Sequence, residues 1–176
     1  MNLSVKDIVD RSKKGDQQAF KQLYDRYAAQ MLGVCMRYTH SRDEAQDLLH
    51  DGFIKVFEGL NNLKSVDALS SWIYNIMVNT AINYVQRKSA KYEKLVDVTD
   101  AMMSAPLNYD EFDVKYLLHL IQQLPDKYRI VFNLHEVEGY SYDEIAKRLK
   151  LESSSVRSIL CRARQMLQEN IKHDEQ

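Results

Sequence analysis

Apolar residues recur at steps of three and four along much of this chain, which is the spacing of one face of an α-helix. The longest of these stripes consists of Phe20, Leu23, Tyr24, Tyr27, Met31, Val34, Cys35 and Tyr38. Asp16 stands where this helix needs an N-cap, because its carboxylate can accept hydrogen bonds from the first free N–H groups. A short helix is predicted before it, opening at Ser4 with Asp7 and ending near Lys14.

Two more amphipathic helices are predicted in the N-terminal part. Ser41 and Glu44 have the spacing of a capping box. The inner face of the helix that they open is predicted to consist of Ala45, Leu48, Leu49, Phe53, Val56, Phe57 and Leu60. A polar loop, residues 60–70, should separate it from a helix over residues 71–88. The buried stripe of that helix is predicted to be Leu69, Trp72, Ile73, Ile76, Met77, Thr80 and Tyr84.

The helical period lapses over residues 93–110, which we interpret as a linker, and then resumes. A helix is predicted up to Leu124, and Pro125 should open the next one, because proline suits the first turn of a helix. Gly139 is a natural helix end, since glycine readily adopts the left-handed conformation. The predicted fold is all-α, with two small helical domains at residues 1–92 and 111–176.

The stretch 141–165, SYDEIAKRLKLESSSVRSILCRARQ, has the pattern of two short helices that meet at a sharp turn. Ser141 and Glu144 form another capping box, and Ser153, Ser154 and Ser155 are predicted to cap the second helix. The inward residues of the second helix would be Val156, Ile159, Leu160 and Ala163. The outward ones would be Arg157, Ser158, Cys161, Arg162 and Arg164.

This outward face suits a DNA groove, although an αα-hairpin with an apolar seam needs no nucleic acid. The stretch holds six basic residues and three acidic ones, in a chain with a net charge of -1. Such a local excess of positive charge favours binding to phosphates. We therefore interpret the stretch as a DNA-binding helix-turn-helix.

Composition narrows the class of protein. The 176 residues include only 5 Gly and 2 Pro, which favours helices over a sheet of many strands. The sequence shows neither a signal-peptide pattern nor an apolar run of membrane-spanning length, so a cytoplasmic protein without membrane insertion is predicted. Cys35 and Cys161 belong to no metal-binding motif, and the histidines are scattered. We expect no metal site, no cofactor and no enzymatic activity.

Two surfaces outside the helix-turn-helix carry unusual patterns. Residues 42–58 contain five acidic and two basic residues on the outer face of a helix, which is either a solvated surface or a docking face for a basic partner. Asn75, Asn79 and Asn83 recur every four residues, although asparagine is a mediocre helix former. This row is either chance solvation or a surface that hydrogen-bonds to bases and phosphates.

The ordered set of motifs resembles a sigma factor of the sigma-70 family, in particular the two-domain extracytoplasmic-function (ECF) type. The motifs are Gly15-Asp16 with Ala19-Phe20 and Leu23-Tyr24, the run DEAQDLLHDGF at 43–53, WIYNI at 72–76 with Asn79, and Leu124-Pro125 through Arg162-Ala163-Arg164. Any one of them is weak evidence, but together they span nearly the whole chain.

The resemblance implies a role for each surface. The helix with Asp47, His50, Asp51 and Lys55 corresponds to the region that grips the β′ coiled coil of core RNA polymerase. The β flap is implied as another contact. The loop and helix that follow correspond to the parts that open the minus-10 element and hold flipped bases. Their predicted site residues are Trp72, Tyr74, Asn75, Asn79, Asn83, Gln86, Arg87 and Lys88, of which Trp72 could instead be purely core.

The helix from Ser153 corresponds to the reader of the minus-35 element in the major groove, where Arg157 and Arg162 would contact base edges or phosphates. The family often has glycine where this chain has Lys150. A positive φ there would cost a lysine on the order of 1 kcal/mol, so the sequence leaves the conformation of this turn open. The partners implied are core polymerase, promoter DNA and an anti-sigma protein, although no residue identifies the last.

The class of protein that competes with this interpretation is a ligand-responsive repressor or activator that binds duplex operators as a dimer. It would explain the helix-turn-helix, with residues 1–90 as the dimerisation region. It leaves the acidic face, the asparagine row and the long linker without a role. The sequence therefore favours a sigma factor that binds core polymerase and directs promoter-specific initiation.

Overall fold

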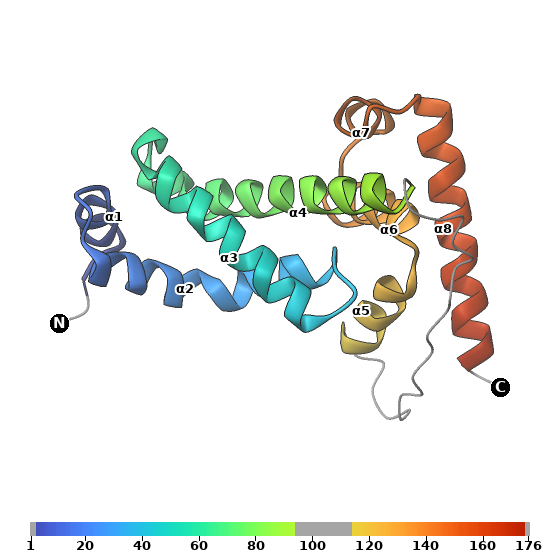
Figure 1. Ribbon diagram of the computed structural model, residues 1–176, viewed down its shortest axis with the longest axis horizontal. Coiled ribbons are helices and arrows are strands. Elements are labelled where there is room, and N and C mark those ends of the chain that lie inside the picture. The colour runs from blue at the N-terminus through green and yellow to red at the C-terminus, as the bar shows by residue number, and fades with distance from the viewer. Residues whose placement is uncertain (1–2, 94–113, 175–176) are drawn as a thin grey trace. The chain divides into compact units, whose positions relative to one another are not determined.

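The computed structural model describes residues 3–93 and 114–174, and all regular elements within these ranges are helical (Figure 1). The all-α fold class is thereby confirmed. The chain divides into two compact units, residues 1–36 with 41–83 and residues 37–40 with 84–176. The predicted linker, residues 93–110, lies outside the described residues except for its first position. The predicted domain limits therefore stay a prediction.

The first two helices of the first unit begin at the caps that the sequence predicts. The Ser4 hydroxyl accepts the Asp7 N–H at 3.1 Å and the Asp7 carboxylate accepts the Ser4 N–H, which opens α1, Val5–Lys13. The Asp16 carboxylate accepts the N–H groups of Gln18 at 2.9 Å and Ala19 at 3.1 Å, which opens α2, Gln17–Met36. The hydrogen bond from Ala19 and that from Arg11 lower the pKa of Asp16.

Helices α3, Arg42–Gly59, and α4, Leu69–Glu93, complete the first unit, and the last residues of α4 group with the second. The predicted loop between them contains two 3₁₀ turns, η1, Leu60–Asn62, and η2, Val66–Ala68, and α4 begins two residues earlier than the sequence suggests. The approach of α3 to α4 depends on Gly52. A Cβ at this position would overlap Sδ of the fully buried Met77.

Burial in α3 and α4 departs from the predicted stripes in two ways. Phe57, predicted to face inward, is 46% exposed and contacts the ring of Phe20 edge-on, at 4.7 Å between centroids. On α4, three residues predicted to be inward, Trp72, Ile76 and Tyr84, are only partly buried. The helix instead buries a second set that the stripe omitted, Val78, Ala81, Ile82 and Val85.

The second unit contains four α-helices among the described residues: α5, Val114–Gln123; α6, Asp126–Phe132; α7, Tyr142–Leu149; and α8, Ser153–Asp174 (Figure 1). Leu120 and Leu124 pack with Ala163 and Leu167 in the core between α5 and α8. Pro125 occupies the N-cap of α6, as predicted for a helix start. After α6 the chain forms a π-helical turn, η3, Asn133–Val137, and Gly139 takes the predicted left-handed conformation with φ 76.

A buried arginine organises the corner between α5 and α6. Arg129 is 1% exposed and donates to the carbonyls of Gln122 at 3.1 Å and Leu124 at 3.2 Å, and it pairs with Asp126. Burial raises the pKa of Asp126. The hydrogen bond from His40 and the charges of Arg129, His40 and Lys88 outweigh this effect, so the pKa is lowered overall. The corner is therefore held by charges that are largely shielded from water.

The structure shows the conformation of Lys150, which the sequence left open. Lys150 has φ 57 and ψ 45, so it adopts the left-handed conformation that the family's glycine would allow without strain. The next N–H, from Leu151, donates to the Ala146 carbonyl at 2.9 Å, as in a Schellman helix end. This bond satisfies a terminal carbonyl of α7 and offsets the cost of the lysine. The turn is formed as in a glycine-containing helix-turn-helix.

Candidate docking face and nucleic-acid interface

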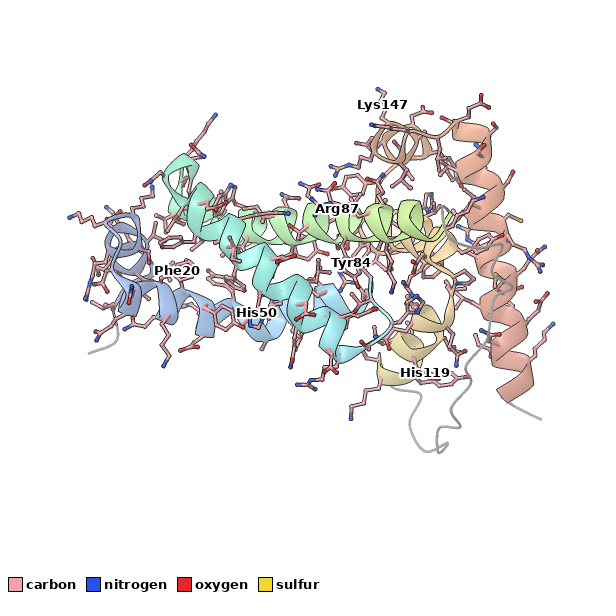
Figure 2. All side chains as sticks on the ribbon, viewed as in Figure 1. Phe20, His50, Tyr84, Arg87, His119 and Lys147 are labelled. Atoms are coloured by element: carbon pink, nitrogen blue, oxygen red, sulfur yellow. The ribbon has the colours of Figure 1, made fainter. Side chains whose placement is uncertain are left out.

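The outer side of α3 presents an acidic face, which we define as Asp43, Asp47, Asp51 and Glu58, all exposed. The predicted docking residues Asp47, His50, Asp51 and Lys55 are likewise exposed. The His50 ring (Figure 2) lies parallel to that of Tyr24, at 6.3 Å between centroids. Lys55 turns toward α4, where its Nζ donates to the Thr80 hydroxyl at 3.0 Å.

Two apolar side chains that sequence reasoning did not place on the surface interrupt this acidic face. Ile54 is 56% exposed and Phe57 is 46% exposed. Single exposed apolar side chains are normal on a protein surface, but neighbouring ones that are rimmed by charges mark interaction sites. The signal in the sequence was the width of the apolar stripe on α3, which is too broad for one face of a helix to bury.

The asparagines of α4 lie where the sequence predicts. Asn75, Asn79 and Asn83 are all exposed, and together we call them the amide face. Tyr74 and Trp72 are partly buried, and the Trp72 ring lies near Gly59, so it packs within the unit. The structure brings the three amides to one side of α4 with a partly buried tyrosine among them.

The C-terminal part of α4, which groups with the second unit, carries the remaining predicted minus-10 residues. Arg87 is exposed (Figure 2). The Lys88 ammonium lies 5.9 Å from the centroid of the Tyr84 ring, and the Gln86 amide donates to the Arg148 carbonyl at 3.4 Å. Gln86 and Lys88 are partly buried. Their side chains are therefore more restrained than that of Arg87.

Helix α8 presents the predicted outward face. Ser154, Ser155, Arg157, Ser158, Cys161, Arg162 and Arg164 are exposed, whereas Val156, Ile159, Leu160 and Ala163 are buried. The predicted serine cap is wrong in detail. All three serines lie inside the first turn of α8, and the Glu152 carbonyl accepts the first helical N–H, from Val156, at 3.1 Å. The Ser153 hydroxyl instead donates to Asp143 of α7, which ties the two helices together.

The exposed arginines of α8 contact residues that sequence reasoning did not single out. Arg164 Nε donates to Glu136 Oε1 at 3.0 Å, and this hydrogen bond raises the pKa of Arg164 and lowers that of Glu136. The Arg157 guanidinium lies 5.0 Å from the centroid of the Tyr142 ring. Glu136 is in η3 and Tyr142 begins α7, so these contacts depend on the fold and no local motif reveals them.

Further basic residues surround α8. Lys147 projects into solvent from α7 (Figure 2), and Arg148 and Lys150 are exposed beside it. The Arg148 guanidinium lies 4.3 Å from the centroid of the Tyr140 ring. Within residues 3–93 and 114–174, no group of three His, Cys, Asp or Glu side chains could hold a metal ion, and no helix is long and apolar enough to cross a membrane. This surface therefore presents several exposed basic side chains beside those of α8.

Comparison with known proteins assigns this architecture to a protein family. Residues 23–91 match the family model of sigma-70 region 2, and residues 115–167 match that of sigma-70 region 4. The chain is 32% identical over 173 residues to the RNA polymerase sigma-H factor of Pseudomonas aeruginosa, a match that covers 91% of this chain and 90% of that protein. The chain belongs to the sigma-70 family. The resemblance predicted from the motifs is confirmed.

Other relatives specify the type of sigma factor. The chain is 31% identical over 177 residues to the ECF RNA polymerase sigma-E factor of Escherichia coli, covering 93% of this chain and 92% of that protein. The fold is similar to the sigma factor RpoE of Bartonella quintana, solved with the anti-sigma factor NepR, at a TM-score of 0.53 and 21% identity over 88% of this chain and 98% of that one. The protein is an ECF-type sigma factor for transcription initiation, and a dimeric repressor is not favoured.

Proposed function

We propose that this sigma factor docks on core RNA polymerase through the acidic face of α3. The observation that carries the proposal is the exposure of Asp47 and Asp51 beside the exposed apolar side chains of Ile54 and Phe57. A partner surface that is basic at its rim and apolar at its centre would complement this face, because charges steer association and apolar contacts hold it. The region 2 match over residues 23–91 supports the β′ coiled coil as that surface.

The amide face of α4 would hold the opened minus-10 element. Unpaired bases present donors and acceptors that duplex DNA hides, and asparagine amides offer both kinds of group without a charge. Flipping a base costs a few kcal/mol, which contacts in a pocket and stacking on rings such as Tyr74 would offset. The basic end of the helix, with Arg87 and Lys88, would follow the phosphates.

The outward face of α8 would read the duplex of the minus-35 element. An α-helix fits the major groove, and an arginine there can contact a guanine with two hydrogen bonds. Arg157, Arg162 and Arg164 are exposed on this face, and Lys147, Arg148 and Lys150 add positive charge nearby. Positive charge draws the helix to the phosphates, whereas the arginine contacts choose the sequence.

Two further assignments follow from the same proposal. A factor that binds core polymerase works in the cytoplasm, and the β flap is a second contact expected for region 4. An anti-sigma protein would fit the exposed faces of α3 and α8, because a sigma factor solved with its anti-sigma partner has a similar fold. Covering these faces would keep the factor from polymerase and DNA.

The proposal is tested by adding the purified full chain to core polymerase with a promoter library randomised at both elements. Transcribed sequences should converge on one upstream and one downstream element. In Asp47→Lys with Asp51→Lys, binding to core polymerase should weaken roughly 100-fold or more, because like charges in an interface cost several kcal/mol. Fluorescence anisotropy of the labelled sigma factor measures the loss.

A matched control carries the same change of charge on other helices. Asp10 of α1 and Asp25 of α2 are exposed, and Asp10→Lys with Asp25→Lys should bind core polymerase within about threefold of the wild type. Circular dichroism of both double variants checks the fold. If the two double variants bound core polymerase with equal affinity, α3 would not be the docking face. This would hold even if the protein still initiates transcription.

A further inference from the structure

The arginines on the outward face of α8 are held in different ways. Arg164 donates from Nε and Nη2 to one oxygen of Glu136, so its charge already has an anionic partner. Arg157 lies over the face of Tyr142, a position that restricts its long side chain. Arg162 contacts residues of its own helix, Gln165 at 3.4 Å and Glu169 at 3.9 Å. Two of these arginines are therefore positioned by residues outside α8.

Those outside residues form one connected group, which we call the holding cluster: His135, Glu136 and Tyr142. The His135 ring stacks on Tyr142 with centroids 4.8 Å apart and planes 21° apart. Its Nδ1 lies 3.3 Å from Glu136 Oε1. Through this cluster the ion pair at Arg164 and the stacked Arg157 are physically linked, although they lie seven positions apart on α8.

The π-helical turn η3 explains how the cluster reaches α8. The Glu138 N–H donates to the Asn133 carbonyl at 3.0 Å, a five-residue step that widens the helix. Asn133 and Leu134 are fully buried, so they fix the turn, while His135 is partly buried and Glu136 is exposed. Such widened turns are rare and often occur at functional sites. Here the turn brings the Glu136 carboxylate beside Arg164.

We propose that the holding cluster sets the affinity and the sequence selectivity with which α8 binds DNA. The cluster itself would not contact bases. Glu136 occupies Arg164 as a DNA phosphate would, so any phosphate must displace it and binding to every sequence is weakened. Tyr142 holds the Arg157 guanidinium over its ring, so this arginine would meet a base edge with little further loss of side-chain freedom. The first effect lowers affinity uniformly, and the second raises affinity only for the correct sequence. This inference rests on the proposed role of α8 in reading duplex DNA.

The two effects have separate signatures in the complex of the full chain with core polymerase. The probes are two promoter duplexes, one with the upstream element selected by the wild type and one with that element scrambled. Glu136→Gln should bind both duplexes about two- to fivefold more tightly, because a half-exposed ion pair is a modest competitor. The affinity of this variant should also fall more steeply as the salt concentration rises. The change in slope should correspond to roughly one additional phosphate contact.

Tyr142→Leu should bind the selected duplex about three- to tenfold more weakly and the scrambled duplex as the wild type does. Tyr142→Phe keeps the ring and should restore the wild-type affinity. Glu169→Gln is the control for charge, since it removes the same charge from a carboxylate that lies 3.9 Å from Arg162. It should change affinity for either duplex less than Glu136→Gln does.

A spectroscopic measurement separates this inference from the proposed function. In the free full chain, the Nε–H NMR signal of Arg164 should move and exchange faster with water in Glu136→Gln, and not in Glu169→Gln. An unchanged Arg164 signal, or a Glu136→Gln variant that binds no more tightly, overturns the inference while the selected promoter still supports the function. A wild type that binds both duplexes equally overturns the reading role of α8 and the inference with it.

Discussion

The interiors of the two units are built from different kinds of residue. Among the described residues, the buried polar side chains of the first unit are the hydroxyls of Ser12 and Thr80. The second unit buries Thr39, the charged Arg129 and the amide of Asn133. The interior of the first unit is therefore held by the close packing of apolar side chains. The interior of the second unit depends also on buried hydrogen bonds and charges, whose partners water cannot replace if they are lost.

This difference bears on the faces proposed to bind polymerase and DNA. The acidic face and the amide face lie on α3 and α4, whose approach is set by Gly52 and Met77. Helix α8, with the exposed arginines of its outward face, packs on α5 and α6, whose corner is held by Arg129. A change of shape should therefore damage the first unit selectively, and a change of charge should damage the second.

The largest effect is expected from Arg129→Met, which keeps a long side chain and removes the buried charge. Asp126 loses its partner and the carbonyls of Gln122 and Leu124 lose their donor. Breaking a buried pair in this way costs about 3–5 kcal/mol. Hydrogen exchange of the full chain should show lost protection in α6 and α8, with α2 unaffected.

Lys127→Met is the matched control, because Lys127 is the exposed neighbour of the same pair on α6. It removes the same charge and should change the free energy of unfolding by less than about 0.5 kcal/mol. Equal protection of α8 in both variants would show that the buried charge is not what holds the second unit. Loss of protection in both units would show that their stabilities are not separable.

A smaller effect, in the other unit, is expected from Gly52→Ala. The added methyl group would collide with the buried Met77, and overpacking of this kind costs about 1–3 kcal/mol. Gly33→Ala on α2 provides a control, since nothing lies within 4 Å of a Cβ at that position. The free energy of unfolding of Gly33→Ala should be up to about 1 kcal/mol higher than that of the wild type, because alanine is the better helix former.

The two glycine variants are compared by denaturant unfolding and by hydrogen exchange in α3 and α4. Opposite signs at the two positions would establish that close packing, and not helix propensity, fixes the spacing of α3 and α4. A stabilised Gly52→Ala would mean that Met77 moves aside easily, and the first interior would then be less tightly packed than described.

Periodicity was sufficient to predict the helices, because each one buries a stripe and several of them, such as α1, α3 and α7, begin at a recognisable cap. It failed where more than one face of a helix is covered, as with Val78 and Ala81 of α4. It also failed at Phe57, because a stripe on one helix does not tell how much of it the neighbouring helices cover. The sequence indicated that a left-handed Lys150 would be strained. It could not show the hydrogen bond from the Leu151 N–H to the Ala146 carbonyl, which offsets this strain in the folded turn.

The site was predictable in its exposed residues and not in the contacts that hold them. The outward face of α8 follows from the inward positions of Val156 and Ile159 in a helix. Glu136 lies 28 positions from Arg164 in sequence, Tyr142 belongs to another helix, and the widened turn that presents Glu136 has no motif. Contacts of this kind arise from tertiary structure, which a single sequence does not report.

The smallest expected effect is on the stability of the two units at low pH. The pKa is lowered for Asp126, Glu136 and Glu144 in the second unit and for Asp16 in the first. A carboxylate with a lower pKa in the folded state stabilises it above the unfolded pKa, and this stability is lost as pH falls through the folded pKa. Below about pH 4 the second unit should therefore lose stability faster than the first.

Asp126→Asn isolates the buried contributor to this difference. The variant should be less stable than the wild type at pH 7, because Arg129 loses its anionic partner. Since the wild type loses the Asp126 contribution in acid, the two proteins should converge as the pH falls toward 3. Hydrogen exchange in α6 as a function of pH measures the convergence. A constant gap between the two proteins at all pH values would show that Asp126 acts through shape, and the electrostatic contrast between the units would then rest on Arg129 alone.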